Sequence, residues 1–140
     1  MIMTLQKDYG IIPLWSLSIF GAETSMGRPE DALSLVFNFG CIRYNPETKD
    51  SPWGRLALEI PVHLNDRDWL AFSDAWTGIA AWGRLIKLEY LDLLRSGGVA
   101  AAVPKYYGVT VEGYSDYLAN VIRIEAAVKA SLDAYVKGAA

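Results

Sequence analysis

The sequence has only one cysteine, Cys41, and only one histidine, His63. A single cysteine excludes an intramolecular disulfide, so we expect a reducing compartment or a chain that folds without this cross-link. Zinc sites usually take three or four ligands from His, Cys and carboxylate side chains. With so few of the first two types, the sequence predicts no metal site.

Long apolar runs, basic runs and phosphate-binding loops are also missing. Charge interrupts each apolar stretch before the roughly 18 residues of a membrane-spanning helix, and the first ten residues lack the apolar segment of a signal peptide. Lysine and arginine are scattered, with a net charge of -3 and no phosphate-tracking stripe. No G-x-G-x-x-G or G-x-x-x-x-G-K loop occurs. We expect a cytoplasmic protein without a cofactor that binds neither nucleic acid nor membrane.

Catalytic motifs are equally scarce. No G-x-S-x-G sequence occurs, and a nucleophile with an imidazole base would have to use His63. Cys41 and His63 lie in segments predicted to be neighbouring strands, so a Cys–His pair is one possibility. The alternative, which we favour, is that Cys41 fills the core and His63 is solvated. The balance is against an enzyme.

What the first half does contain is alternation of apolar and polar residues, which predicts strands. The pattern covers residues 11–20, 31–44 and 55–64, and the phase changes at Gly40 as it would at a β-bulge. The second and third segments form a predicted antiparallel hairpin. Pro61 favours an edge position for the last strand.

The second half has helical spacing of its apolar residues. It predicts a helix over residues 66–95, with Asn65 or Asp66 as N-cap and with Gly78 or Gly83 as places where it could divide. A last helix is predicted over residues 115–137. Small residues in both helices predict a close crossing between them, or reflect only the helix propensity of alanine.

Strands first and helices afterwards predict an α+β fold in one domain, residues 1–140. An antiparallel sheet of three or more strands from the N-terminal half would be packed on one face by two or three helices from the C-terminal half. The order of the strands stays open.

Aromatic residues in predicted loops are the main candidates for function. Trp53 follows Pro52 in a turn-rich connection that Arg43 and Arg55 flank, and Tyr106 and Tyr107 follow Pro104 and Lys105. Tyr, Trp and Arg are enriched at interface hot spots. We therefore predict a protein-binding site at the residues Trp53, Arg43, Arg55, Tyr106 and Tyr107. The alternative is that these aromatics fold back onto the core.

Two functions follow. The first is a small non-catalytic interaction domain, such as an adaptor, inhibitor or assembly factor, of the kind that phages and mobile elements encode against host complexes. Its partner would be another protein, or a second copy in a homodimer. The second is a small-molecule-binding domain, or a metal-independent enzyme, with an aromatic-lined pocket between sheet and helices. A pocket lined by Trp and Tyr would favour the second, and a flat patch containing Trp53 the first.

Overall fold

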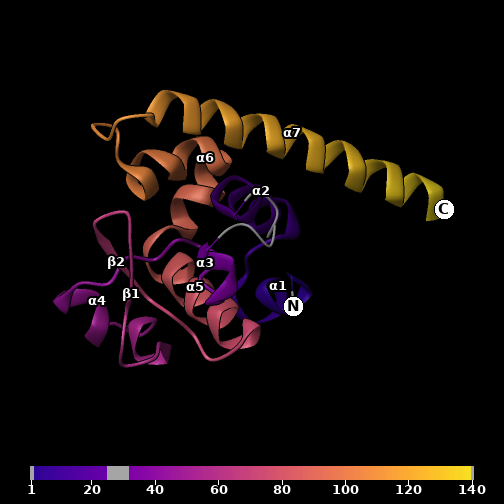
Figure 1. The fold of residues 1–140 in the computed structure, drawn as a ribbon. Coiled ribbons are helices and arrows are strands. Elements are labelled where there is room, and N and C mark those ends of the chain that lie inside the picture. The colour runs from indigo at the N-terminus through magenta and orange to yellow at the C-terminus, as the bar shows by residue number, and fades with distance from the viewer. Residues whose placement is uncertain (1, 25–31, 140) are drawn as a thin grey trace.

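The computed structural model describes residues 2–24 and 32–139, and helices account for 69% of it (Figure 1). Two of the short elements are a 3-10 turn, η1, and a π-helical turn, η2. The elements in chain order are α1 (Ile2–Tyr9), α2 (Pro13–Thr24), α3 (Ala32–Leu35), α4 (Pro46–Asp50), η1 (Gly54–Leu56), β1 (Val62–Leu64), β2 (Arg67–Trp69), α5 (Ala75–Glu89), α6 (Leu91–Val103), η2 (Pro104–Gly108) and α7 (Tyr114–Ala139).

The predicted fold class was wrong. Among the described residues the only sheet has two antiparallel strands, β1 and β2, where we had predicted three or more strands. Helices occur in both halves of the chain and are not confined to the second. The errors have separate physical causes in the three segments that alternate.

The first error concerns residues 11–20, most of which form α2 and not a strand. Pro13 is the first residue of the helix, where its missing N–H costs no hydrogen bond and its fixed φ suits the helix. Ser16 and Ser18 are completely buried. Their hydroxyls donate to the carbonyls of Pro13 and Leu14, at 3.2 and 2.6 Å. Because the serine hydroxyls form their hydrogen bonds within the helix, both the polar and the apolar side chains can be buried. The alternation of polar and apolar residues therefore does not indicate a strand here.

The second segment, residues 31–44, falls partly outside the described residues, and in the remainder only Arg43 joins a bridge, to Trp69. Phe37 and Cys41 have φ values of 57° and 47°, which a strand does not contain. Gly40 is not a bulge. A Cβ atom there would lie 2.0 Å from the ring of Trp82, so glycine lets this loop touch the core tryptophan.

In the third segment, residues 55–64, only Val62–Leu64 forms a strand. The alternation does not mark a buried face, because Leu58 is 49% and Ile60 79% exposed. The turn that follows is a β-hairpin turn, with φ values of 53° and 56° at Asn65 and Asp66. Asn and Asp favour both helix caps and left-handed turn positions. The predicted N-cap was therefore wrong, because these two residues form a hairpin turn instead.

The predicted helix over residues 66–95 begins later and is interrupted. Asp74 is the N-cap of α5 and accepts a hydrogen bond from the Thr77 N–H at 2.9 Å. Tyr90, with φ −133°, separates α5 from α6, and α6 is kinked at Gly97 and Gly98. The division therefore occurs at neither of the glycines that we had considered.

The last helix is confirmed, since α7 covers Tyr114–Ala139. The close crossing of α5 and α7 at small residues was wrong: α7 packs chiefly on α2 and α6. Gly78 in α5 instead faces a backbone carbonyl, Phe37 O, which would lie 1.9 Å from a Cβ atom. In Figure 1, α7 lies across α6 and α2, and its C-terminal part extends past them.

The core brings the helices together around Trp82, which is fully buried. Trp82 contacts Phe20 of α2, with ring centroids 4.4 Å apart. The hairpin and α4 lie on the other side of the molecule from α7 (Figure 1). Within the described residues, no helix combines the length and the apolar character needed to cross a bilayer.

Candidate functional site

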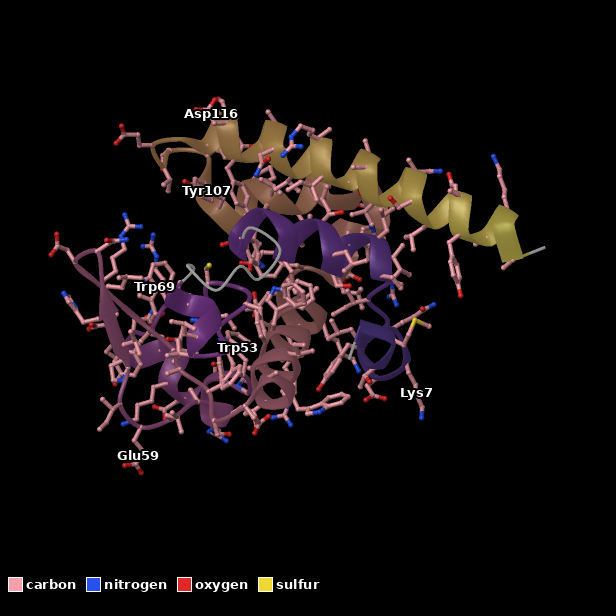
Figure 2. All side chains as sticks on the ribbon, turned by 45° about the vertical axis from the view of Figure 1, so that its right-hand side comes forward. Lys7, Trp53, Glu59, Trp69, Tyr107 and Asp116 are labelled. Carbon is pink, nitrogen blue, oxygen red and sulfur yellow. The ribbon has the colours of Figure 1, made fainter. Side chains whose placement is uncertain are left out.

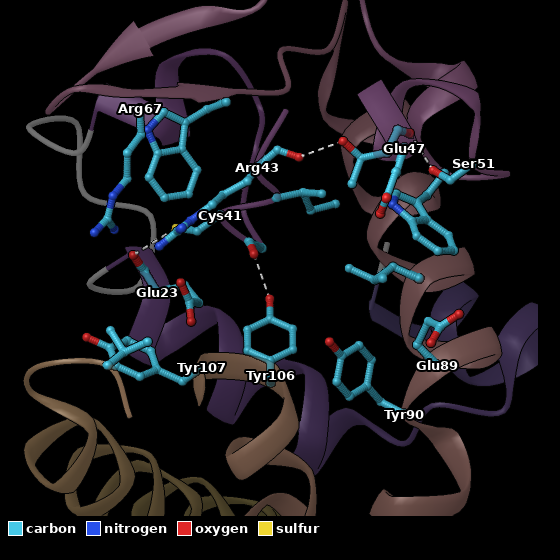
Figure 3. A pocket seen from close by; sticks show the side chains of 17 residues that line it. Glu23, Cys41, Arg43, Glu47, Ser51, Arg67, Glu89, Tyr90, Tyr106 and Tyr107 are labelled. Carbon is cyan, nitrogen blue, oxygen red and sulfur yellow. Dashed lines mark hydrogen bonds between the residues drawn. The ribbon is translucent and has the colours of Figure 1, made fainter. Parts of the chain in front are cut away.

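A cavity of about 700 Å³ lies between two parts of the molecule. One part is the β1–β2 hairpin with α4, and the other is the C-terminal end of α5 with η2. Figure 3 shows it from close by. Three of the residues that line it, Trp53, Trp69 and Tyr107, lie on separate parts of the ribbon in Figure 2. The side chains that line it are partly aromatic, partly charged and partly small and polar. They include Glu23, Cys41, Arg43, Glu47, Thr48, Ser51, Trp53, Arg67, Trp69, Leu85, Glu89, Tyr90, Tyr106, Tyr107 and Val111.

The floor of the cavity is held by a buried amide, Asn38, which is 1% exposed. Its Nδ2 donates to the carbonyls of Ile42 and Leu70, at 2.9 and 2.8 Å, and its Oδ1 accepts from the Ile42 N–H at 2.8 Å. These bonds tie the loop of residues 38–42 to the chain that follows β2. Gly40, Cys41 and Ile42 are thereby fixed along the cavity.

One wall is the short helix α4 with the turn after it. Asn45 caps α4 in a capping box with Thr48, and Pro46 is the first helical residue. The hydroxyl of Ser51 donates to Thr48 O at 2.5 Å and accepts from the Gly54 N–H at 3.0 Å. This locally closed turn presents Thr48, Ser51 and Trp53 to the cavity.

Trp53 is partly buried and packs against the core. Its Nε1 is buried, and within the described residues it has no hydrogen-bond partner. An unsatisfied buried donor costs about 1–3 kcal/mol. Next to it, Arg84 of α5 donates to Pro52 O at 3.0 Å, which attaches the turn to the helix.

The opposite wall is β2 with the neighbouring backbone of Arg43. Residues two apart in a strand point to the same face, so Arg67 and Trp69 both face the cavity, and Asp68 faces away from it. Trp69 Nε1 donates to Leu64 O at 3.1 Å, and the Arg43 guanidinium lies 5.7 Å from the centre of the Trp69 ring. These contacts fix the ring as a flat wall with a cation over it.

The π-helical turn η2 directs its two tyrosines differently. Tyr106 turns inward: its hydroxyl donates to Gly40 O at 2.6 Å and accepts from Trp82 Nε1 at 3.2 Å. Its ring meets that of Tyr90 edge to face, with centroids 5.3 Å apart. Figure 3 shows the ring of Tyr106 beneath the cavity with its hydroxyl pointing to the floor loop.

Tyr107 turns outward and stacks on Tyr117 of α7, with centroids 4.3 Å apart and planes 18° from parallel. The Tyr107 hydroxyl donates to Glu112 O at 3.2 Å. Tyr117 in turn donates to the carboxylate of Glu23, at the end of α2. The stack thus joins the cavity to the contact between α2 and α7.

Burial determines the protonation of these phenols. It raises the pKa of Tyr106 well above the ordinary value of 10.0, and the nearby Glu23 carboxylate adds to the effect. Burial likewise raises the pKa of Tyr117, again with Glu23 as the next cause. Both are therefore neutral at physiological pH and donate hydrogen bonds. They support the site as fixed donors, and neither is a candidate base.

Four of the five predicted site residues meet at this cavity: Arg43, Trp53, Tyr106 and Tyr107. Arg55 is exposed and does not line it. Cys41 lines the cavity and donates a weak hydrogen bond to Glu23 O at 3.6 Å. His63 does not line it, and its Nδ1 contacts the Asp68 carboxylate at 2.8 Å. The possible Cys–His pair is therefore not formed.

Sequence reasoning missed other residues of the site, chiefly Arg67 and Trp69, which we had assigned to a helix. The Asn65-Asp66 dipeptide was the available signal, because Asn and Asp also favour the left-handed positions of a tight hairpin turn. Such a turn brings Trp69 opposite Val62. Tyr90 gave no such signal, since only the tertiary fold brings it to the cavity.

Among the described residues, no three His, Cys, Asp or Glu side chains cluster closely enough to hold a metal ion. Comparison with known proteins adds no relative: no family model, no curated protein and no solved structure matches this chain. The chemistry of the cavity itself is therefore the basis for a function.

Proposed function

We propose that this protein binds a flat, largely apolar small molecule in the cavity. The observation that carries the proposal is that Trp53, Trp69, Tyr90, Tyr106 and Tyr107 all line one cavity of about 700 Å³. Ligand pockets typically measure about 300–1,000 Å³ and are lined by aromatic and apolar side chains with a few polar groups. The proposal adopts the second of the two functions that the sequence suggested.

The walls support binding because hydrogen bonds hold them in place before a ligand enters. Trp69 is held by Leu64 O, and Tyr106 by Gly40 O and Trp82. A rigid aromatic surface loses little conformational entropy when it is covered. Leu85 and Val111 add apolar contacts. Such walls can cover both faces of a planar ring system.

Fluorescence titration with N-phenyl-naphthylamine, a neutral and flat probe, tests the proposal. We expect one saturable site per chain. Cys41 offers a way to place that site, because it is the only cysteine and it lines the cavity. Alkylation of Cys41 with a bulky maleimide should abolish probe binding.

The matched control is Cys41→Ser, which keeps the site open but cannot be alkylated. This variant should bind the probe equally well before and after maleimide treatment. Circular dichroism should show that the alkylated protein is still folded. No saturable binding, or binding that survives alkylation of Cys41, would overturn the proposal.

A protein-interaction function keeps one observation in its favour. The C-terminal part of α7 extends past the other helices (Figure 1), and it exposes 77% of Tyr135 and 66% of Val136. With Val128 and Leu132 these residues follow helical spacing, so they form one apolar stripe. The occupant that we propose for it is the α7 helix of a second copy, in antiparallel orientation.

Packing supports the antiparallel orientation. α7 packs on α2 and α6 of its own chain, and the stripe lies in its C-terminal part. Antiparallel pairing through the stripe places the two helical bodies at opposite ends of the dimer, whereas parallel pairing would bring them side by side. Sedimentation equilibrium should show a concentration-dependent dimer that Tyr135→Glu abolishes. The surface control, Lys87→Glu on α5, should leave the dimer unchanged. A monomer at all concentrations would exclude this second function.

A further inference from the structure

Two arginines are placed side by side at one wall of the cavity. Arg43 is bridged to Trp69 across antiparallel chains, and Arg67 lies two residues before Trp69 on the same face of β2. Arg43 and Arg67 are therefore diagonal neighbours across the two chains. Side chains in this relation lie about 7–8 Å apart at their origin, which is within reach of each other.

No described carboxylate forms an ion pair with either arginine. The ion pairs there join His63 with Asp68, Lys105 with Glu89, and Lys129 with Asp133. Neither Arg43 nor Arg67 makes an ion pair or a side-chain hydrogen bond to another described residue. Two neighbouring guanidinium groups repel each other, and an anion placed between them would remove that cost.

The acidic residues around the cavity leave this wall positive. Glu89 is paired with Lys105 at 3.0 Å. Glu23 keeps its negative charge although it accepts a hydrogen bond from the neutral Tyr117 hydroxyl, and Figure 3 shows it on the same side of the cavity as Arg67. Two guanidinium groups against this one carboxylate still leave the wall with a net positive charge. Figure 3 shows Glu47 and Glu89 on the side away from Arg67, next to Ser51 and Tyr90. A negatively charged group of a ligand would therefore bind at the wall formed by Arg43 and Arg67, which we call the arginine wall. The carboxylates of the opposite wall would repel it.

The ring of Trp69 determines how far the acidic group of a ligand can lie from its planar ring. Arg43 lies over that ring, and Arg67 projects from the same strand face. A guanidinium is planar and has N–H donors along its edge, so it can stack on an aromatic ring while it binds an oxyanion in its own plane. A ligand that satisfies both features carries its acidic group directly on, or one or two bonds from, a planar ring.

We infer that the ligand is an aromatic acid, a planar ring system with a carboxylate, sulfonate or phosphate group that Arg43 and Arg67 bind together. This inference rests on the proposed function and adds the charge of the ligand to it. The walls lined by Trp53, Trp69 and Tyr107 receive the ring, and the two guanidinium groups receive the acidic group.

The test compares two probes that share a ring skeleton. Anilinonaphthalene sulfonate carries an acidic group, and N-phenyl-naphthylamine lacks it. The sulfonate makes its probe more soluble in water, so apolar contact alone would make it bind more weakly. We expect it to bind about tenfold more tightly at low salt, and the difference to shrink as salt screens the exposed arginines.

Variants assign the effect to the arginine wall. Arg67→Ala should weaken binding of the sulfonated probe about tenfold and weaken binding of the neutral probe by less than that, because the neutral probe loses only contact with the arginine stem. Arg43→Gln should act in the same direction. The control is Arg55→Ala, because Arg55 is also exposed but does not line the cavity. All three positions are exposed, so thermal unfolding should show that the variants fold.

Each outcome decides between the two claims. If both probes bind equally well and Arg67→Ala changes neither, the acidic ligand is excluded while the cavity remains a binding site. If neither probe binds, the proposed function fails and this inference fails with it. Displacement of the sulfonated probe by naphthoate or by naphthyl phosphate then distinguishes a carboxylic acid from a phosphate ester. Failure of both to displace it would restrict the acidic group to a sulfonate.

Discussion

Two regions of this protein are held together in different ways. The helical body, residues 2–24 and 75–139, has long helices packed on apolar side chains such as Ile19, Trp82 and Val121. The cavity segment, residues 36–72, has only elements of three to five residues. Side-chain-to-backbone hydrogen bonds from Asn38, Ser51 and Trp69 determine its course.

The comparison explains where the cavity is. Apolar packing tolerates small shifts, but hydrogen bonds fix atoms in direction as well as distance. The cavity lies between the two regions, with a floor and two walls from the cavity segment and the remaining wall from α5 and η2. A rigid polar scaffold facing an apolar body is suited to orient a ligand that has both kinds of surface.

The largest effect should come from Trp82, which belongs to both regions: its ring lies in the apolar core and also faces Gly40. Trp82→Ala should lower the free energy of unfolding by about 3–5 kcal/mol, measured by urea denaturation. Trp76 is the matched control because it lies on the same helix but is 58% exposed. Trp76→Ala should cost less than about 1 kcal/mol. Equal losses would contradict the assigned core.

The second-largest loss of stability should come from a variant of Asn38, which tests the hydrogen bonds of the cavity segment only. Asn38→Ala leaves the Leu70 carbonyl and the Ile42 N–H without their hydrogen-bond partner, whereas the Ile42 carbonyl still accepts from the Leu70 N–H. The variant should lower the free energy of unfolding by about 2–4 kcal/mol. Asn120→Ala on α7, whose side chain accepts one hydrogen bond, from Arg123, within the described residues, should cost less than about 0.5 kcal/mol. A mild effect at Asn38 would mean that apolar packing also holds this segment.

The contact between α2 and α7 should respond to alkaline pH. Burial raises the pKa of Tyr117 in the folded state, above the ordinary 10.0 of the unfolded chain. The folded protein therefore keeps a proton that the unfolded chain loses, and its stability falls as the pH rises above about 10. The expected slope is roughly 1 kcal/mol per pH unit for this residue.

Urea denaturation at about pH 8 and about pH 11 measures this dependence. Tyr117→Phe should be less stable at the lower pH, because it loses the bond to Glu23, and should lose less on going to the higher pH. Tyr135→Phe, at an exposed position of the same helix, should behave like the original protein. A slope that Tyr117→Phe leaves unchanged would contradict the role of Tyr117.

The smallest effect should come from Trp53, where the two regions meet with a polar atom unsatisfied. Trp53→Phe keeps an aromatic ring and removes the buried Nε1, so stability should stay the same or rise by up to about 1 kcal/mol. Trp53→Ala removes the packing against the core and should destabilise by about 1–3 kcal/mol. Similar losses for both variants would show that Nε1 has a partner in solution.

The sequence was most informative where local spacing and tertiary packing agree. α7 was predicted because its apolar residues keep helical spacing over many turns. α2 was missed because Ser16 and Ser18 alternate with apolar residues, as they would in a strand, although their hydroxyls are satisfied within the helix. The cavity segment was missed because its decisive bonds, such as Asn38 to Leu70, join residues 32 positions apart.

The candidate site shows the same division. An aromatic side chain in a turn-rich segment has no local core to enter, and this argument identified Trp53, Tyr106 and Tyr107 from the sequence. The sequence alone thus determined the supply of aromatic and charged side chains, the last helix, and the scarcity of metal ligands. Only the tertiary structure decided that these side chains surround one cavity and that Arg67 joins Arg43 there. The physical reason is that the spacing of residues close together in the sequence does not determine which side chains are buried, or which distant residues form hydrogen bonds.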